Sequence, residues 1–106
     1  MARVSRFRVL LDRYPERFLQ RFLHADEIEE LHSKPASQRA AYAASRWACK
    51  EAAFKSLGGA DVPLFPHMKV AVPEMQGLRR HQRVLLTLSH EEDEFAVAVA
   101  ASIAAE

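Results

Sequence analysis

The sequence predicts an α+β fold in which helices pack on a small antiparallel sheet. Two observations support this fold class. In the first half of the chain apolar residues recur at helical spacing, whereas beyond residue 67 they alternate as they do in strands. Helical segments that come first, followed by strands that can pair antiparallel, are typical of α+β domains.

Four helical segments are expected before residue 58. Residues 3–13 and 15–23 form two short helical pieces, and Pro15 suits the first turn of the second because a missing N–H costs nothing there. Asp26 can cap a brief third helix. Ser37 can cap a long fourth helix that runs to Leu57.

Three strands are expected after the long helix. Gly58 and Gly59 suit a left-handed cap of that helix, and they begin a loop that is rich in glycine and proline. Alternating apolar residues then predict strands at 68–72, 83–89 and 95–103. The acidic residues just before the last strand are expected to form the turn of a hairpin with the strand before it.

Small residues indicate how the last strand and the long helix pack. One face of the last strand carries Ala96, Ala98, Ala100 and Ser102. The long helix has a small-residue stripe of its own, made of Ala41, Ala44, Ala48 and Ala52. Because small side chains let a helix approach a sheet closely, we expect these two faces to meet.

Length and composition indicate one folded domain over residues 1–106. The 106 residues are 49% hydrophobic and 27% charged, which excludes a disordered chain. No apolar run approaches the roughly 20 residues that a membrane-spanning helix needs, so we expect no membrane insertion. The single cysteine, Cys49, excludes an internal disulfide and a multi-cysteine metal site, and we expect it to be buried.

Charge is distributed unevenly along the chain. Residues 1–23 hold six arginines against one aspartate and one glutamate, a balance of 6 − 2 = +4, so the remainder carries 1 − 4 = −3. A basic end favours an acidic partner: nucleic acid, an anionic membrane surface or an acidic carrier protein. The same arginines suit a mitochondrial transit peptide, although Pro15 and the apolar stripe after it favour a folded helix. Cytoplasmic and mitochondrial locations both remain open.

The most informative stretch is residues 46–58, which read Arg-Trp-Ala-Cys-Lys-Glu-Ala-Ala-Phe-Lys-Ser-Leu-Gly. Glu51 and Lys55 are four residues apart and therefore neighbours on one helix face. Arg46 and Lys50 form a second pair that is turned away from the first. This stretch resembles the signature helix of the 4'-phosphopantetheinyl transferases, in particular the small holo-acyl-carrier-protein synthases, with Ser45 in place of the family's first glycine.

Two further stretches resemble the same family in the same order. Arg6-Phe7, residues 16–23 and Glu27 are similar to its first helix and its Arg-Phe-x-x-Arg-x-Leu-x-x-x-Glu element. Leu88-Ser-His90, followed by an acidic turn and Phe-Ala-Val-Ala-Val, is similar to its closing Ser-His hairpin. The resemblance therefore covers most of residues 6–100.

The resemblance implies an activity, a metal and ligands. The family moves phosphopantetheine from coenzyme A onto a serine of apo acyl carrier protein with Mg²⁺ bound to the pyrophosphate, and so supports fatty acid biosynthesis. Glu51 then matches the metal-binding and catalytic glutamate, and Lys55 matches the catalytic lysine that meets the phosphates. Arg46, Lys50 and His90 join Lys55 as residues expected to bind coenzyme A.

The resemblance also implies partners. A carrier protein's acidic helix would explain the basic N-terminal region, where the expected docking residues are Arg6, Arg13, Arg17 and Arg21. At 100° per residue, Arg46 and Glu51 lie about 140° apart around the helix axis. One compact ligand does not easily reach both, so either coenzyme A wraps around the helix or Arg46 serves a neighbouring subunit. The family's homotrimer fits the second option.

One departure from the family concerns the N-terminus. These synthases open with a strand of the form Gly-Ile-Gly-x-Asp-Ile, whose aspartate is a second metal ligand. This chain reads Met-Ala-Arg-Val-Ser-Arg at that place, so we expect the strand and its aspartate to be missing, the domain to be N-terminally incomplete and transfer to be slow or undetectable. Asp12 lies well inside the first helix and is a poor substitute.

Two functions from other classes stay open. The chain could be a non-catalytic module that binds acyl carrier protein and keeps the docking helix without the metal site. It could also be a small nucleic-acid-binding domain that uses its basic end. This last interpretation ranks lowest, because the sequence has no aromatic stacking sheet and no recognition-helix pattern.

Overall fold

The computed structural model describes residues 1–59, 61–91 and 94–104. The helices are α1 (Val4–Arg13), α2 (Pro15–Leu19), α3 (Ala25–Ser33) and α4 (Ala36–Ser56), and a 3-10 turn, η1, covers Phe65–His67. The strands are β1 (Ala2–Arg3), β2 (Lys69–Ala71), β3 (Glu74–Gln76), β4 (Gln82–Glu91) and β5 (Phe95–Ala104). The α+β prediction is therefore confirmed.

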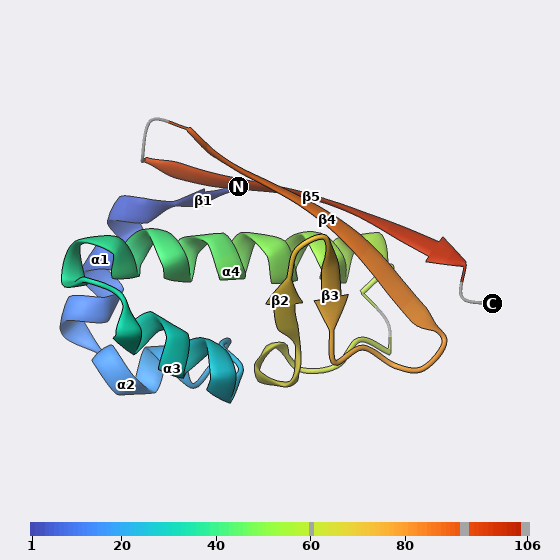
Figure 1. The fold of residues 1–106 in the computed structure, drawn as a ribbon, viewed down its shortest axis with the longest axis horizontal. Coiled ribbons are helices and arrows are strands. Elements are labelled where there is room, and N and C mark those ends of the chain that lie inside the picture. Colours follow the sequence, from blue (N-terminus) through green and yellow to red (C-terminus); the bar gives the residue numbers. More distant parts are fainter. Residues whose placement is uncertain (60, 92–93, 105–106) are drawn as a thin grey trace.

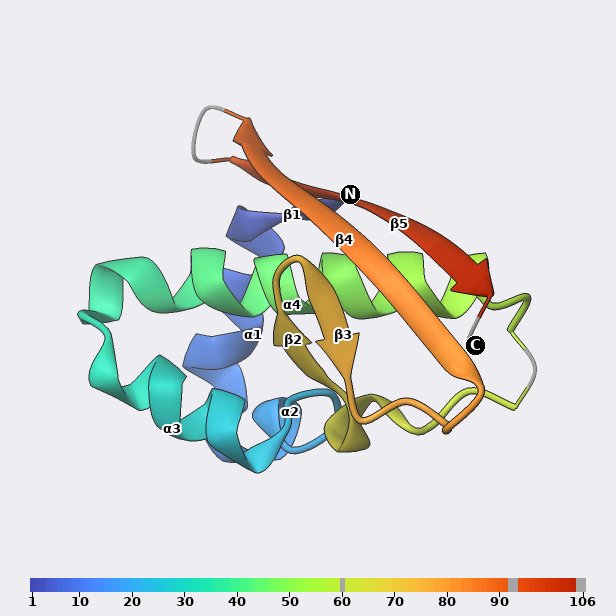
Figure 2. The same ribbon diagram turned by 45° about the vertical axis from the view of Figure 1, so that its right-hand side comes forward.

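The strands form one antiparallel sheet in the order β1-β5-β4-β3-β2. Figure 1 shows α4 at the centre, with the long β4–β5 hairpin on one side, α2 and α3 on the other, and α1 passing behind its N-terminal part. The turned view in Figure 2 shows β2 and β3 beside β4 and in front of α4. The hairpin is the predicted one, and residues 92–93 of its turn lie outside the described residues. No helix in the described part of the chain is long and apolar enough to cross a membrane.

Two short strands correct the sequence prediction. An N-terminal strand was expected to be missing, yet β1 pairs with β5 through Ala2 opposite Ala96 and Arg3 opposite Phe95. The amide of Val4 continues this attachment by donating to the carbonyl of Glu94 at 2.7 Å. β3 was also not predicted, because three residues are too short to show alternation.

The small-residue faces of α4 and β5 meet as predicted. Ala44, Ala48 and Ala96 are each no more than 2% exposed, and α4 packs along the length of β5. Ala98 and Ala100 are partly buried against the core on the same face of β5. The side chain of Ser102, assigned to this face from the sequence, lies outside the described residues.

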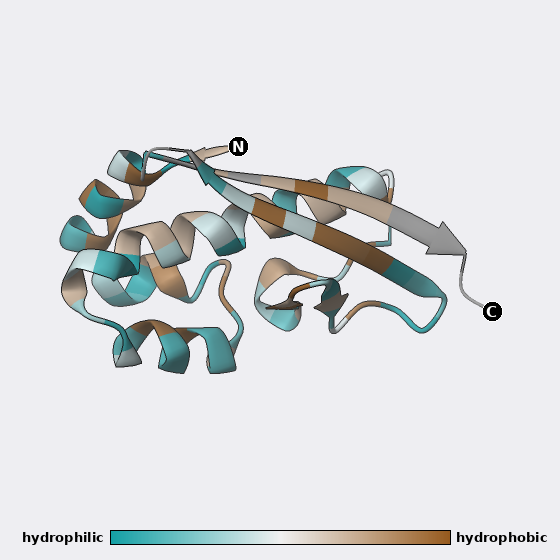
Figure 3. Cartoon of the chain, turned by 45° about the horizontal axis from the view of Figure 1, so that its top comes forward, coloured by the Kyte–Doolittle hydropathy of each residue, from teal (hydrophilic) through white to brown (hydrophobic). Residues whose placement is uncertain are grey.

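Two hydrophobic clusters lie along α4. One joins the N-terminal half of α4 to α1, α2 and α3, and the other joins its C-terminal half to β2, β3 and β4. Figure 3 shows the resulting pattern, with hydrophilic residues along the outer side of α3 and hydrophobic ones in the middle of β4. Phe65 in η1 packs against both clusters and so lies where they join.

The helix caps agree with the sequence only in part. His24, rather than Asp26, caps α3, because its Nδ1 accepts from the amide of Asp26 at 3.0 Å. α4 begins at Ala36, after Pro35, so Ser37 is not its cap. The predicted cap at Gly58 is confirmed, with φ of +78° and an amide that donates to the carbonyl of Lys55 at 3.1 Å.

Candidate functional site

An open cavity of about 1100 Å³ lies between α4 and the N-terminal residues up to α2. Trp47 and Glu51 contribute its α4 wall, and because they are four residues apart they share one helix face. The opposite wall comes from the N-terminal segment, α1 and α2, through Met1, Ala2, Arg3, Ser5, Arg6, Phe7, Val9, Leu10 and Phe18. The cavity lining is therefore mainly apolar, with one carboxylate, Glu51, and two cationic side chains, Arg3 and Arg6.

Glu51 and Lys55 lie on one face of α4 as predicted. Lys55 Nζ is 3.9 Å from Glu51 Oε1, and the two side chains are 74% and 37% exposed. At this distance the pair is loose, and an exposed pair of this kind contributes only about 0.2–0.5 kcal/mol to stability. Both groups thus remain accessible to a charged ligand.

Glu51 could hold a metal ion only as a single carboxylate ligand, with the other ligands supplied by substrate and water. No group of three or more His, Cys, Asp or Glu side chains that could hold a metal is found among the described residues. Asp12 lines a different hollow, together with Arg8 and Arg39, so it does not join Glu51. Magnesium, however, is commonly held by one or two carboxylates and completed by substrate phosphates and water. Glu51, a partly exposed carboxylate on the wall of a wide cavity, fits this mode.

Three of the four arginines predicted to meet a partner line the cavity or the hollow next to it. Arg6 lines it directly. Arg17 and Arg21 line a smaller hollow of about 250 Å³ that shares Leu10 and Phe18 with the cavity. Arg13 is exposed in the last turn of α1. The four expected docking arginines are all exposed, and none forms an ion pair with another described residue.

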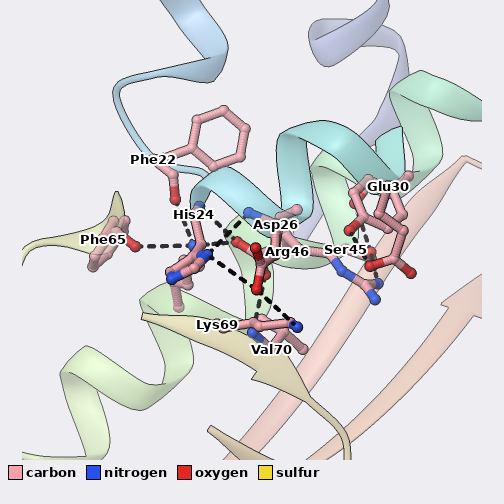
Figure 4. Close-up of polar contacts among 12 residues, drawn as sticks. Phe22, His24, Asp26, Glu30, Ser45, Arg46, Phe65, Lys69 and Val70 are labelled. Atoms are coloured by element: carbon pink, nitrogen blue, oxygen red, sulfur yellow. Dashed lines mark hydrogen bonds and ion pairs between the residues drawn. The ribbon is translucent and has the colours of Figure 1, made fainter. Parts of the chain in front are cut away.

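Arg46 lies on a different face of α4 from Glu51, as the helix geometry predicts. Its guanidinium lies 4.2 Å from the centre of the Tyr42 ring, and its Nη1 donates to Ser45 Oγ at 2.9 Å. Its Nε is buried and has no hydrogen-bond partner among the described residues. The Tyr42 hydroxyl donates to Glu30 Oε2 at 3.0 Å, and burial raises the pKa of Tyr42. Figure 4 shows Arg46, Ser45 and Glu30 together, apart from the polar contacts around His24.

His90 is separated from the cavity as well. It lies exposed near the end of β4, opposite Ala96 of β5, and it does not line the cavity. Neither does Arg46. Within one chain the structure places Glu51 and Arg6 on the cavity wall and Lys55 next to Glu51, although Lys55 does not itself line the cavity, and it leaves Arg46 and His90 away from the wall.

The expectation that Lys50 binds coenzyme A is wrong in this structure. Lys50 is fully buried, and its Nζ donates to Glu27 Oε1 at 2.6 Å, to the Phe22 carbonyl at 2.6 Å and to the Phe65 carbonyl at 2.9 Å. An ammonium has three protons, so none remains for a ligand. The position of Lys50 in the sequence could have indicated its burial. Lys50 lies seven residues after Ala43 and three before Ala53, and therefore on the buried face of α4.

Trp47 belongs both to the cavity wall and to an aromatic cluster in the core. It lines the cavity, and its ring makes edge contacts with the rings of Phe22 and Phe65, each at 5.5 Å between centroids. Phe7 and Phe18 extend this aromatic cluster toward α1 and α2. Ring contacts between residues so distant in sequence leave no local pattern, which is why they were missed.

Comparisons with known proteins point to one family. The sequence model of the 4'-phosphopantetheinyl transferase superfamily matches residues 1–100. A holo-[acyl-carrier-protein] synthase of Nitrosococcus oceani is 45% identical over 58 residues, which are 55% of this chain and 36% of that protein. A holo-[acyl-carrier-protein] synthase of Maridesulfovibrio salexigens is 41% identical over 58 residues, which are 55% of this chain and 44% of that protein.

These two matches span less than half the length of either curated relative. The family match, in contrast, takes in all four helices, β1 to β4 and the start of β5. It includes the cavity, the Glu51–Lys55 pair and the buried Lys50. On this evidence the chain belongs to the 4'-phosphopantetheinyl transferase superfamily.

Proposed function

We propose that this protein transfers the 4'-phosphopantetheine group of coenzyme A to a serine of an apo acyl carrier protein, and so supports fatty acid biosynthesis. One observation carries the proposal: Glu51, which pairs with Lys55 on the signature helix, lines a wide cavity that Arg6 also lines. Membership of the superfamily and the likeness to two holo-[acyl-carrier-protein] synthases support it.

Each residue of the pair has a distinct task in this proposal. The serine oxygen attacks the phosphorus that carries the pantetheine arm, and the bond from that phosphorus to the leaving adenosine 3',5'-bisphosphate breaks. The Glu51 carboxylate accepts the serine proton as a general base. The Lys55 ammonium binds a phosphate oxygen, which stabilises the negative charge that develops there.

Glu51 would also hold a magnesium ion, together with phosphate oxygens and water. When bound, this ion neutralises charge on the pyrophosphate. With one carboxylate in place of two, we expect the ion to bind weakly and transfer to be slow.

The exposed arginines would receive the carrier protein. Arg6 lies on the cavity wall, and Arg17 and Arg21 lie beside the adjoining hollow, so an acidic helix that binds there would bring its serine to the cavity. Complementary charge of this kind mainly accelerates association. Arg13 extends the same basic region.

A homotrimer would give Arg46 and His90 a role. Both lie outside the cavity of their own chain, so they would meet coenzyme A only in a site shared between subunits. Light scattering at high micromolar concentration, with coenzyme A present, should then report a trimer. A clean monomer would contradict a shared site.

The test of the proposed activity is the mass of the carrier protein. Apo acyl carrier protein incubated with this protein, coenzyme A and Mg²⁺ should gain the mass of one phosphopantetheine group. Glu51→Gln should abolish the gain, whereas Glu29→Gln, which changes an exposed carboxylate on α3, should preserve it. Binding of carrier protein without a mass change would favour the non-catalytic module. Binding of nucleic acid in place of both ligands would favour the third interpretation.

A further inference from the structure

We infer that Lys50 and Glu27 form a buried positioning pair that sets the α4 wall of the cavity. Neither residue lines the cavity itself. They act on it through Phe22, Phe65 and Trp47. That the cavity binds a ligand rests on the function proposed above, whereas the arrangement of the wall does not.

The pair connects five segments of the chain. Lys50 from α4 binds the carbonyls of Phe22, which follows α2, and Phe65 in η1. Glu27 from α3 accepts from Lys50 and from the His24 amide through Oε1, and from the Val70 amide of β2 through Oε2 at 2.9 Å. Figure 4 shows the carbonyls of Phe22 and Phe65 directed toward the centre of this group, with Val70 below it.

The two carbonyls that Lys50 holds belong to the two rings that contact Trp47. The rings of Phe22 and Phe65 approach the indole at interplanar angles of 80° and 73°. Lys50 thus fixes the backbone of both phenylalanines, and their rings fix Trp47, which shares the cavity wall with Glu51. Trp47, Lys50 and Glu51 lie within five positions of one helix, so this contact acts on the turn of α4 that carries Glu51.

The pair is fully satisfied despite its burial. Lys50 and Glu27 are both 0% exposed, and their hydrogen bonds use all three ammonium protons and both carboxylate oxygens. Burial lowers the pKa of Lys50 and the Glu27 carboxylate opposes this shift. An apolar pair could fill the same volume, but it would leave two carbonyls and two amides without these partners. The charged pair therefore leaves none of its own polar atoms without a hydrogen bond. Its bonds also hold each of these segments in one position.

The test uses Trp47, the only tryptophan in the chain, as a reporter. Its emission spectrum and its quenching by acrylamide are measured in Lys50→Met, in Glu27→Gln and in the double variant Lys50→Met/Glu27→Met. The double variant leaves no unpaired buried charge, so it guards against unfolding of the single variants. Lys69→Met is the matched control, because Lys69 neighbours Val70 but pairs at the surface with Asp26 at 3.3 Å. Circular dichroism selects the variants that are folded at low temperature.

In the folded variants of the pair, we expect emission at longer wavelengths and acrylamide quenching that rises about twofold, since both rings are free to leave the indole. Lys69→Met should keep the native spectrum. Native emission in any folded variant of the pair would overturn the inference and leave Lys50 and Glu27 with a role in stability alone.

The carrier-protein assay then links the wall to the chemistry. In the folded variants, kcat for transfer should fall by about 10²-fold with little change in KM, because a displacement of about 1 Å can cost that much. An unchanged kcat would also overturn the inference. If the native protein shows no transfer, the proposed function fails, and the emission measurements still decide whether the pair positions Trp47.

Discussion

Lys50 and Lys55 belong to the same motif on the same helix, yet their surroundings are opposite. Lys50 is fully buried and donates three hydrogen bonds, at 2.6, 2.6 and 2.9 Å. Lys55 is 74% exposed, and the nearest carboxylate oxygen is 3.9 Å away. Five residues turn a helix by about 140°, which directs one side chain into the core and the other toward solvent beside the cavity.

The difference shows how to divide the charges of the motif by task. A charge whose hydrogen-bonding capacity is used within the chain holds segments together, and its removal leaves buried groups without partners. A charge that is exposed and loosely paired stabilises little, so it is available to a ligand. By this criterion Lys50 and Glu27 belong to the scaffold, and Lys55, Glu51 and Arg6 are the candidates for the proposed site.

The largest expected effect is on stability. Lys50→Met should lower the free energy of unfolding by about 3–5 kcal/mol, because Glu27 is left as a buried charge without a partner. Lys55→Met should change it by no more than about 0.5 kcal/mol. Urea denaturation followed by circular dichroism measures the free energy of unfolding of both variants. Equal losses would contradict the assignment of Lys50 to the scaffold and of Lys55 to the proposed site.

In Lys55→Met, by contrast, activity should fall without this loss of stability. Lys55→Met is expected to lower the rate of phosphopantetheine transfer by about 10²-fold, comparable to the loss of one group that stabilises charge in a transition state. The fold should stay intact, since the side chain is exposed. The mass assay gives the rate, with Lys69→Met as control. A rate for Lys55→Met equal to that of the control would remove Lys55 from the site.

Cys49, the neighbour of Lys50, provides a test by pH. Burial raises the pKa of the Cys49 thiol from 9.0 to about 11. Between pH 9 and 11 the folded protein therefore retains a thiol proton that the unfolded chain releases. The contribution of this proton to the free energy of unfolding is complete below pH 9 and is lost as the pH rises from 9 to 11. It amounts to about 2 kcal/mol. The fall in unfolding free energy across this window should be smaller in Cys49→Ala, and equal slopes would show that the thiol is not protected.

The smallest expected effect is on association. Reversing Arg17 and Arg21 to Glu should slow binding of an acidic carrier protein about tenfold at low salt, and salt should reduce the difference. Binding of coenzyme A should be unaffected, because neither residue lines the main cavity. The matched control is Arg80→Glu, an exposed arginine in the loop before β4. Equal association rates for the two variants would show that Arg17 and Arg21 are ordinary solvent-exposed residues that do not bind the carrier protein.

The sequence predicted those elements of the fold in which a single helical or alternating pattern of apolar residues extends over a long segment. The length of α4, the hairpin of β4 and β5 and their small-residue contact all follow from such patterns. β1 and β3 are two and three residues long, so their existence depends on pairing with distant strands. The cap of α3 was also assigned to the wrong residue, because the imidazole of His24 takes the place of a carboxylate.

The site was predictable to a similar degree. Spacing alone placed Glu51 and Lys55 together and separated Arg46 from them. It could not show that Lys50 meets Glu27, 23 residues away, or that Phe22 and Phe65 enclose Trp47. These contacts depend on how α3 and η1 pack against α4, which no local pattern records.

The most direct test of the division between site and scaffold is calorimetric titration of coenzyme A in the presence of Mg²⁺. Glu51→Gln should weaken binding at least about tenfold, which is ~1.4 kcal/mol, whereas Glu29→Gln should bind as the native protein does. Both variants should unfold at the native temperature, since each changes an exposed or partly exposed carboxylate. Equal affinity in Glu51→Gln and the native protein would show that Glu51 does not hold the ligand or its ion, and the cavity beside α4 would no longer be the site.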